Sequence, residues 1–163
     1  MGENKALLAW RGGRLIDFVA NTVRDAGVSD VFVSGDVSGY ECIPDRTLHQ
    51  GAVGGICASV EKLHPYTQIL FLPVDMPLLS VDCLQKLLDA QNTCHFENNP
   101  LPILLNITPE IIAYTARITE PISMKKYLRG LQTVELPVSP EIAKALTNTN
   151  TPEEWRKANE YTN

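Results

Sequence analysis

The sequence predicts an α/β fold in which a mostly parallel, doubly wound sheet is covered by helices on both faces. Short apolar and β-branched runs alternate along the chain with stretches of helical periodicity, as in sheets whose parallel strands are joined by crossover helices. Of the 163 residues, 44% are hydrophobic, which suffices for one core and hardly for two. No internal repeat, low-complexity tract or long linker interrupts the pattern. We therefore expect a single domain over residues 1–163.

The first half of the chain carries the clearest alternation. Apolar residues recur at helical spacing from Leu15 to Val23, and Gly27 stands where a helix C-terminus favours glycine. A turn composition, Ser34-Gly35-Asp36, ends the short apolar run Val31–Val33. The elements predicted here are a helix over 15–23, a strand over 31–33, a helix over 51–63, a strand over 69–72, and a helix from Ser80, its expected N-cap, through Leu88.

After Asn92 the pattern is less regular, and the predicted elements are shorter. A proline-containing apolar run is compatible with a further strand, and a short run near residue 135 is compatible with a strand at a sheet edge. The elements predicted here are a strand over 100–105, helices over 110–116 and 123–131, an edge strand over 133–136 and a closing helix over 152–160.

The charge balance argues against nucleic acid and membrane surfaces as partners. The formal net charge is −5, and lysines and arginines form no cluster, whereas both kinds of partner require a positive field. An anionic small ligand stays compatible with this composition if its charge is met locally.

The cysteines and the hydropathy pattern indicate a soluble, cytoplasmic protein. Cys42, Cys57, Cys83 and Cys94 are far apart, and no histidine stands at ligand spacing, which favours reduced thiols over a metal-thiolate site. No apolar run approaches the length of a transmembrane helix, and the first five residues do not lead into a signal-peptide core.

Asp75 interrupts the most hydrophobic part of the chain. It follows the predicted strand over 69–72 and is flanked by Pro73 and Pro77. Ligands of doubly wound sheets bind beyond the carboxyl ends of the strands, and a carboxylate there is suited to Mg²⁺ and a phosphate ligand. Alternatively, Asp75 caps the helix that begins near Leu79, although Ser80 is the better candidate for that cap.

Five motifs, taken in order, resemble the MobA family of molybdenum cofactor guanylyltransferases. The Pro-x-Asp-x-Pro element around Asp75 is shared with the wider nucleotidyltransferase class, whereas the closing Asn-x-Asn-Thr-Pro-Glu is more specific to MobA. The motifs are Met1-Gly2-Glu3-Asn4-Lys5-Ala6-Leu7-Leu8, Ile43-Pro44-Asp45, Gly51-Ala52-Val53-Gly54-Gly55-Ile56, Leu72-Pro73-Val74-Asp75-Met76-Pro77 and Thr147-Asn148-Thr149-Asn150-Thr151-Pro152-Glu153-Glu154. The resemblance implies a Rossmann-like sheet of the nucleotidyltransferase type.

The resemblance also implies a reaction. The terminal phosphate of molybdopterin attacks the α-phosphate of GTP, giving the guanine dinucleotide form of the cofactor and pyrophosphate, with Mg²⁺ as cofactor. Transfer of another nucleotide, such as that of CTP, is an alternative within the same class. A catalytically silent domain that binds a nucleotide, a pterin or a molybdoenzyme maturation partner is an alternative of a different class.

Carried over by motif, Lys5 and Asp75 are the expected catalytic residues. Asp75 matches the magnesium ligand, and Lys5 matches the lysine that faces the triphosphate. Without the family, Lys5 would be interpreted as a solvated side chain and Asp45 as part of a common Pro-Asp turn. The expected nucleotide-binding residues are Lys5, Ser34, Asp45, Gly51, Gly54 and Asp75, and those on the pterin side are Asn148 and Asn150.

The beginning of the chain departs from the family, as does Ala52, where proline is usual. MobA proteins start with a strand and a glycine-rich loop, of which Met1-Gly2 matches only the end. We therefore expect an N-terminally incomplete domain, explained either by a start codon upstream of Met1 or by a degenerate relative. The strands over 31–33 and 69–72 are then expected to flank an unfilled position, which favours self-association or marginal stability.

Overall fold

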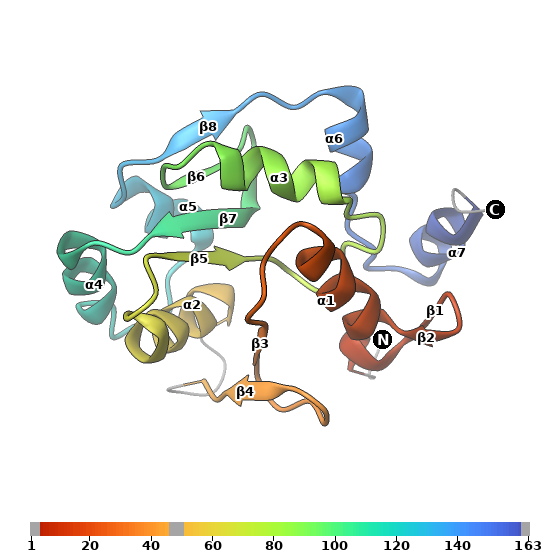
Figure 1. The fold of residues 1–163 in the computed structure, drawn as a ribbon, viewed down its shortest axis with the longest axis horizontal. Helices are drawn as coiled ribbons and strands as arrows, with labels where there is room; N and C mark the ends of the chain where they lie inside the picture. Colours follow the sequence, from red (N-terminus) through yellow and green to blue (C-terminus); the bar gives the residue numbers. More distant parts are fainter. Residues whose placement is uncertain (1–3, 46–50, 161–163) are drawn as a thin grey trace. The chain divides into compact units, whose positions relative to one another are not determined.

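The computed structural model describes residues 4–45 and 51–160, and it confirms the α/β class (Figure 1). Helices flank a sheet, and the described residues fall into two compact units. Within these residues, no helix is long and apolar enough to cross a membrane. The first unit is made of Met1–Val31, Pro73–Lys86 and Val138–Asn163, and the second is made of Phe32–Leu72 and Leu87–Pro137.

The first unit combines a short hairpin with helices from both ends of the chain. Strands β1 and β2 pair antiparallel, and the turn between them places Arg11 and Gly12 at φ 49° and 81°. Trp10, 2% exposed, packs edge to face against Phe18 and Trp155, with ring centroids 6.2 and 5.0 Å apart. The elements are η1 (Lys5–Leu7), β1 (Ala9–Trp10), β2 (Gly13–Arg14), α1 (Leu15–Asp25), α6 (Pro140–Ala145) and α7 (Pro152–Glu160), and α3 (Val81–Asp89) begins here.

The second unit contains the larger sheet and its helices. Buried side chains of α2 pack with those of β7 and with Tyr127 of α5 to form its main core, which holds Val53, Ile56, Cys57, Val60, Ile103, Leu105 and Tyr127. The elements are β3 (Phe32–Ser34), β4 (Glu41–Ile43), α2 (Gly51–Leu63), β5 (Gln68–Phe71), β6 (Cys94–Phe96), β7 (Asn99–Asn106), α4 (Pro109–Ala116), α5 (Met124–Arg129) and β8 (Val134–Leu136).

The strand directions differ from the mostly parallel sheet that the sequence suggested. The larger sheet has the order β5-β7-β6-β8, and β7 is antiparallel to both of its neighbours. The reason is local: β6 and β7 form a hairpin whose turn places Asn98 at φ 59°, and a hairpin can only be antiparallel. The β6–β8 and β3–β4 pairs are parallel, and β8 lies at the edge as expected.

Strands β3 and β5 belong to different sheets and are not hydrogen-bonded to each other. Strand β3 pairs with β4, whereas β5 pairs with β7, so each has one edge without a strand partner in the described part of the chain.

The ten elements expected from the sequence all occur, and the boundaries of each agree within a few residues. The elements that sequence reasoning missed are short, with two or three residues in each strand, three in η1 and six in α6, so they show little periodicity. They are η1, β1, β2, β4, β6 and α6.

Three helices begin with the same type of cap. Thr108 precedes α4, Ser139 precedes α6 and Thr151 precedes α7, and each is followed by proline at the first helical position. The hydroxyl oxygens accept hydrogen bonds from the amides of Ile111, Ile142 and Glu154, respectively. This combination of hydroxyl cap and proline is one of the strongest helix-start signals in a sequence.

Candidate functional site

Asp75 lies in a turn between β5 and α3, and it does not cap α3. The cap is Ser80, whose Oγ accepts a hydrogen bond of 3.3 Å from the Cys83 amide. The carboxylate of Asp75 is therefore available for another role. Its side chain is 22% exposed, so a ligand can still reach it.

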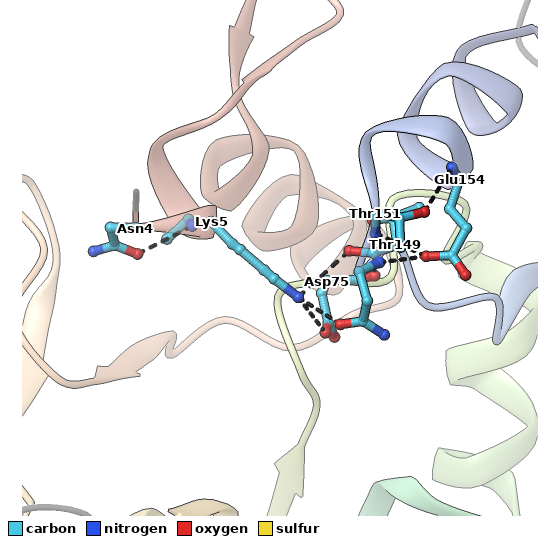
Figure 2. A network of polar contacts seen from close by, with 8 residues as sticks. Asn4, Lys5, Asp75, Thr149, Thr151 and Glu154 are labelled. Carbon is cyan, nitrogen blue, oxygen red and sulfur yellow. Dashed lines mark hydrogen bonds and ion pairs between the residues drawn. The ribbon is translucent and has the colours of Figure 1, made fainter. Parts of the chain in front are cut away.

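Lys5 extends from the short helix η1 toward Asp75 (Figure 2). Its Nζ lies 3.3 Å from Asp75 Oδ2, and it also donates to Asn150 Oδ1 at 2.6 Å and to the Thr149 carbonyl at 3.4 Å. The Asn4 side chain starts η1 by accepting from the Ala6 amide. Three oxygens from two distant segments thus surround one ammonium group, and all of these residues belong to the first unit.

The loop before α7 is held by hydrogen bonds at both of its ends. The amide and the hydroxyl of Thr149 both donate to the Asp75 carbonyl, at 2.9 and 3.2 Å. Glu154 Oε2 accepts from the amides of Asn150 and Thr151, at 2.8 and 2.9 Å, and these bonds hold the pKa of the Glu154 carboxyl below its usual 4.5. Glu154 returns an amide hydrogen bond to Thr151 Oγ1, which completes a capping box.

The donor set around Asp75 fits a hard divalent cation that is shared with a phosphate ligand. Carboxylate, amide and carbonyl oxygens are the donors that Mg²⁺ prefers, and Mg²⁺ usually takes only one or two protein carboxylates. In the described part of the chain, no group of three or more His, Cys, Asp or Glu side chains could hold a metal. Cys83 and Cys94 are disfavoured as thiolate ligands, because burial raises their pKa to about 11.

A second group of expected residues meets in the second unit. Ser34 at the end of β3 donates a hydrogen bond of 3.2 Å to Asp45 Oδ1, which follows β4. Gly55 of α2 faces this pair, and a Cβ at Gly55 would lie 2.5 Å from Ser34 Oγ. The absence of a side chain at this position lets α2 approach the Ser34–Asp45 pair.

The remaining expected residues have less distinct surroundings. Gly51 begins α2 with φ 62°, and Gly54 is buried within the same helix. Asn148 is exposed beside the loop that carries Thr149. Residues 1–3 of the first motif lie outside the described residues.

Sequence reasoning anticipated Lys5, Asp75 and Asn150 as site residues, and the structure brings them together. It missed Thr149 and Glu154. The spacing from Thr151 to Glu154 is that of a capping box, a signal that could have identified Glu154. No local pattern identifies Thr149, because its partner Asp75 is 74 residues away in sequence.

Comparison with known proteins shows which family this chain resembles. A family model described as the MobA-like NTP transferase domain matches residues 1–116, which include Lys5 and Asp75. The chain belongs to this family. The chain is also similar to the molybdenum cofactor guanylyltransferase of Xanthomonas euvesicatoria pv. vesicatoria (strain 85-10). The two sequences are 32% identical over 163 residues. That match covers 96% of this chain and 86% of the relative.

Solved structures show the same MobA-like fold. The molybdopterin-guanine dinucleotide biosynthesis protein A of Archaeoglobus fulgidus superposes with a TM-score of 0.75 at 21% identity, covering 99% of this chain and 91% of the other. Rv0371c of Mycobacterium tuberculosis, solved in complex with manganese, superposes with a TM-score of 0.69 at 17% identity. That match covers 98% of this chain and 93% of the other.

Proposed function

We propose that this MobA-like nucleotidyltransferase is a molybdenum cofactor guanylyltransferase, which joins GMP from GTP to molybdopterin and releases pyrophosphate. The name of the Xanthomonas relative and the near-complete coverage of that match support this assignment. The observation that carries it is the convergence of Lys5, Asp75 and Asn150. The cytoplasmic location stays a prediction.

We propose Mg²⁺ as the cation and Asp75 as the residue that holds it. The bound cation would supply charge neutralisation at the phosphates. The crystallised complex of Rv0371c with manganese supports a divalent cation in proteins of this fold. Asn150 contributes a neutral oxygen 2.6 Å from the Lys5 ammonium, at the same location.

Lys5 and Asp75 would act by charge and position. In the reaction, an oxygen of the molybdopterin phosphate forms a bond to the α-phosphorus of GTP, and the bond from that phosphorus to the pyrophosphate oxygen breaks. Catalysis of this transfer depends mainly on in-line positioning and on neutralising negative charge. The Lys5 ammonium is a compact point charge suited to the triphosphate.

The other expected residues have supporting roles in this proposal. Asn148 and Asn150 would contact the pterin side. Ser34, Asp45, Gly51 and Gly54 would contribute to nucleotide binding, and the hydrogen bond from Ser34 fixes the orientation of the Asp45 carboxylate.

Replacement of Asp75 tests the function. With GTP, molybdopterin and Mg²⁺, Asp75→Asn should lower the rate of dinucleotide formation by about 100-fold or more, because the amide retains the size of the side chain and loses its charge. The melting temperature should stay close to that of the parent. Asp82→Asn, which replaces an exposed acid in the first turn of α3, is the matched control and should retain activity.

Two outcomes of this assay would contradict the proposal. Transfer from CTP without transfer from GTP would assign a different nucleotide. No transfer by the parent from either nucleotide, together with retained nucleotide binding, would favour a silent binding domain.

A further inference from the structure

We propose that Thr149 is a positioning residue that fixes the backbone of Asp75 for cation binding; this inference rests on the proposed function. Thr149 is 1% exposed, so its polar groups are shielded from water. Its amide and its hydroxyl both donate to the Asp75 carbonyl, at 2.9 and 3.2 Å. Its own carbonyl accepts from Lys5 Nζ at 3.4 Å. One buried residue therefore contacts both residues that we assign to the reaction (Figure 2).

The two hydrogen bonds to the Asp75 carbonyl restrict a backbone rotation that Pro73 and Pro77 do not restrict. Pro73 and Pro77 fix the backbone angle φ only at their own positions. The direction of the Asp75 carbonyl depends on the turn between them. Two donors on one carbonyl define the orientation of that peptide group and hence the point from which the carboxylate extends. Groups that orient a metal ligand in this way typically change metal affinity by about 10- to 100-fold when they are removed.

Thr149 can position Asp75 because the loop that carries it is itself anchored. Glu154 of α7 accepts hydrogen bonds from the amides of Asn150 and Thr151, directly after Thr149. Thr151 in turn caps α7 through its hydroxyl. These hydrogen bonds, joined by the backbone from Thr149 to Thr151, therefore connect the start of α7 to Asp75. A hydroxyl on a free loop would follow the movements of Asp75, whereas one on an anchored loop restrains them.

Cation binding in the absence of turnover tests the inference. The probe is Mn²⁺ together with the α,β-methylene analogue of GTP, and the readout is the loss of the free Mn²⁺ signal in electron paramagnetic resonance. Thr149→Val keeps the shape and the amide but removes the hydroxyl, and it should weaken Mn²⁺ binding by about 10-fold or more. Thr149→Ser keeps the hydroxyl and should bind Mn²⁺ within roughly threefold of the parent.

Thr22→Val is the matched control for the general cost of removing a buried hydroxyl. Thr22 lies in α1 of the same unit, is 7% exposed, and donates its hydroxyl to the Phe18 carbonyl at 3.0 Å. Thr22→Val should lower the melting temperature while leaving Mn²⁺ affinity unchanged.

Several outcomes would overturn the positioning role. The first is a Thr149→Val variant that binds Mn²⁺ as tightly as the parent. The second is an equal loss of Mn²⁺ affinity in Thr22→Val and Thr149→Val. The third is a tenfold loss of Mn²⁺ affinity in Thr149→Ser. The last of these applies even if Thr149→Val does not fold. Failure of the proposed function would look different, since a parent that binds Mn²⁺ with the analogue but transfers no GMP would contradict the guanylyltransferase and leave the role of Thr149 intact.

Discussion

At the scale of single residues, Lys5 and Asp75 satisfy each other's charge. Their side chains are 30% and 22% exposed, and the ion pair is 3.3 Å long. Because both side chains are partly exposed, water screens the attraction between them and lowers the cost of separating the pair. A triphosphate with its cation supplies another partner for each charge. Under the proposed function, the triphosphate and its cation would replace this pairing.

Lys5→Ala should weaken GTP binding by about 10-fold or more and guanosine binding by roughly twofold or less, because the ammonium meets phosphate charge and not the base. Calorimetric titration with each ligand measures both effects. Lys157→Ala, which removes an exposed lysine paired with Glu153 on α7, is the control and should alter neither affinity. Equal losses for GTP and guanosine in Lys5→Ala would contradict the proposed role of Lys5.

At the scale of elements, two glycines allow close approach for different purposes. A Cβ at Gly55 would lie 2.5 Å from the hydroxyl of Ser34, the free end of a small side chain that can turn away. A Cβ at Gly130, after α5, would lie 2.2 Å from the ring of Tyr114, which donates a hydrogen bond to the Tyr127 carbonyl. The first approach concerns a candidate binding pair, and the second concerns the core.

Gly55→Ala and Gly130→Ala should therefore affect different properties. The first should change GTP binding, and the second should change stability. Gly55→Ala should displace Ser34 from Asp45 and weaken GTP binding, with little loss of stability, because alanine favours the helix by about 1 kcal/mol over glycine. Gly130→Ala should lower the free energy of unfolding by about 1–3 kcal/mol through overpacking. Urea denaturation and GTP titration of both variants separate the effects. Unchanged GTP affinity in Gly55→Ala would exclude the Ser34–Asp45 pair from nucleotide binding.

At the scale of the whole molecule, the three Ser/Thr-Pro helix starts link stability to pH. Hydrogen bonds from the cap hydroxyls of Thr108 and Ser139 lower the pKa of Glu110 and Glu141, and backbone hydrogen bonds, first from Asn150, lower that of Glu154. All three carboxyls have ordinary values of 4.5. A carboxyl whose pKa is lower in the folded protein contributes stability above its unfolded value. That contribution is lost as the pH falls through the folded value.

The free energy of unfolding should therefore decrease as the pH is lowered below 4.5, the ordinary pKa of these carboxyls. Urea denaturation at a series of pH values measures this dependence. The double variant Glu110→Gln/Glu141→Gln, which leaves Glu154 in place, should show a shallower decrease because two of the three linked carboxyls no longer titrate. An unchanged slope in the double variant would assign the acid sensitivity to other groups.

Local pattern in the sequence determined the elements with enough residues to show a period. The apolar spacing of α1 and α2 and the Ser80 cap each involve residues within a few positions of one another. For this reason they can be recognised without a fold. Asp75 and Lys5 were recognised from motifs, since each stands at a characteristic place in a short, unusual stretch.

Only the tertiary structure decided the strand order and the surroundings of Asp75. Sequence patterns predicted β5 and β7 as strands, but they could not show that β7 inserts antiparallel between β5 and β6. Likewise, the bond from Thr149 to Asp75 joins residues 74 positions apart, and that from Lys5 to Asn150 joins residues 145 apart. Contacts at such separations depend on how the whole chain closes on itself, and local periodicity contains no information about that closure.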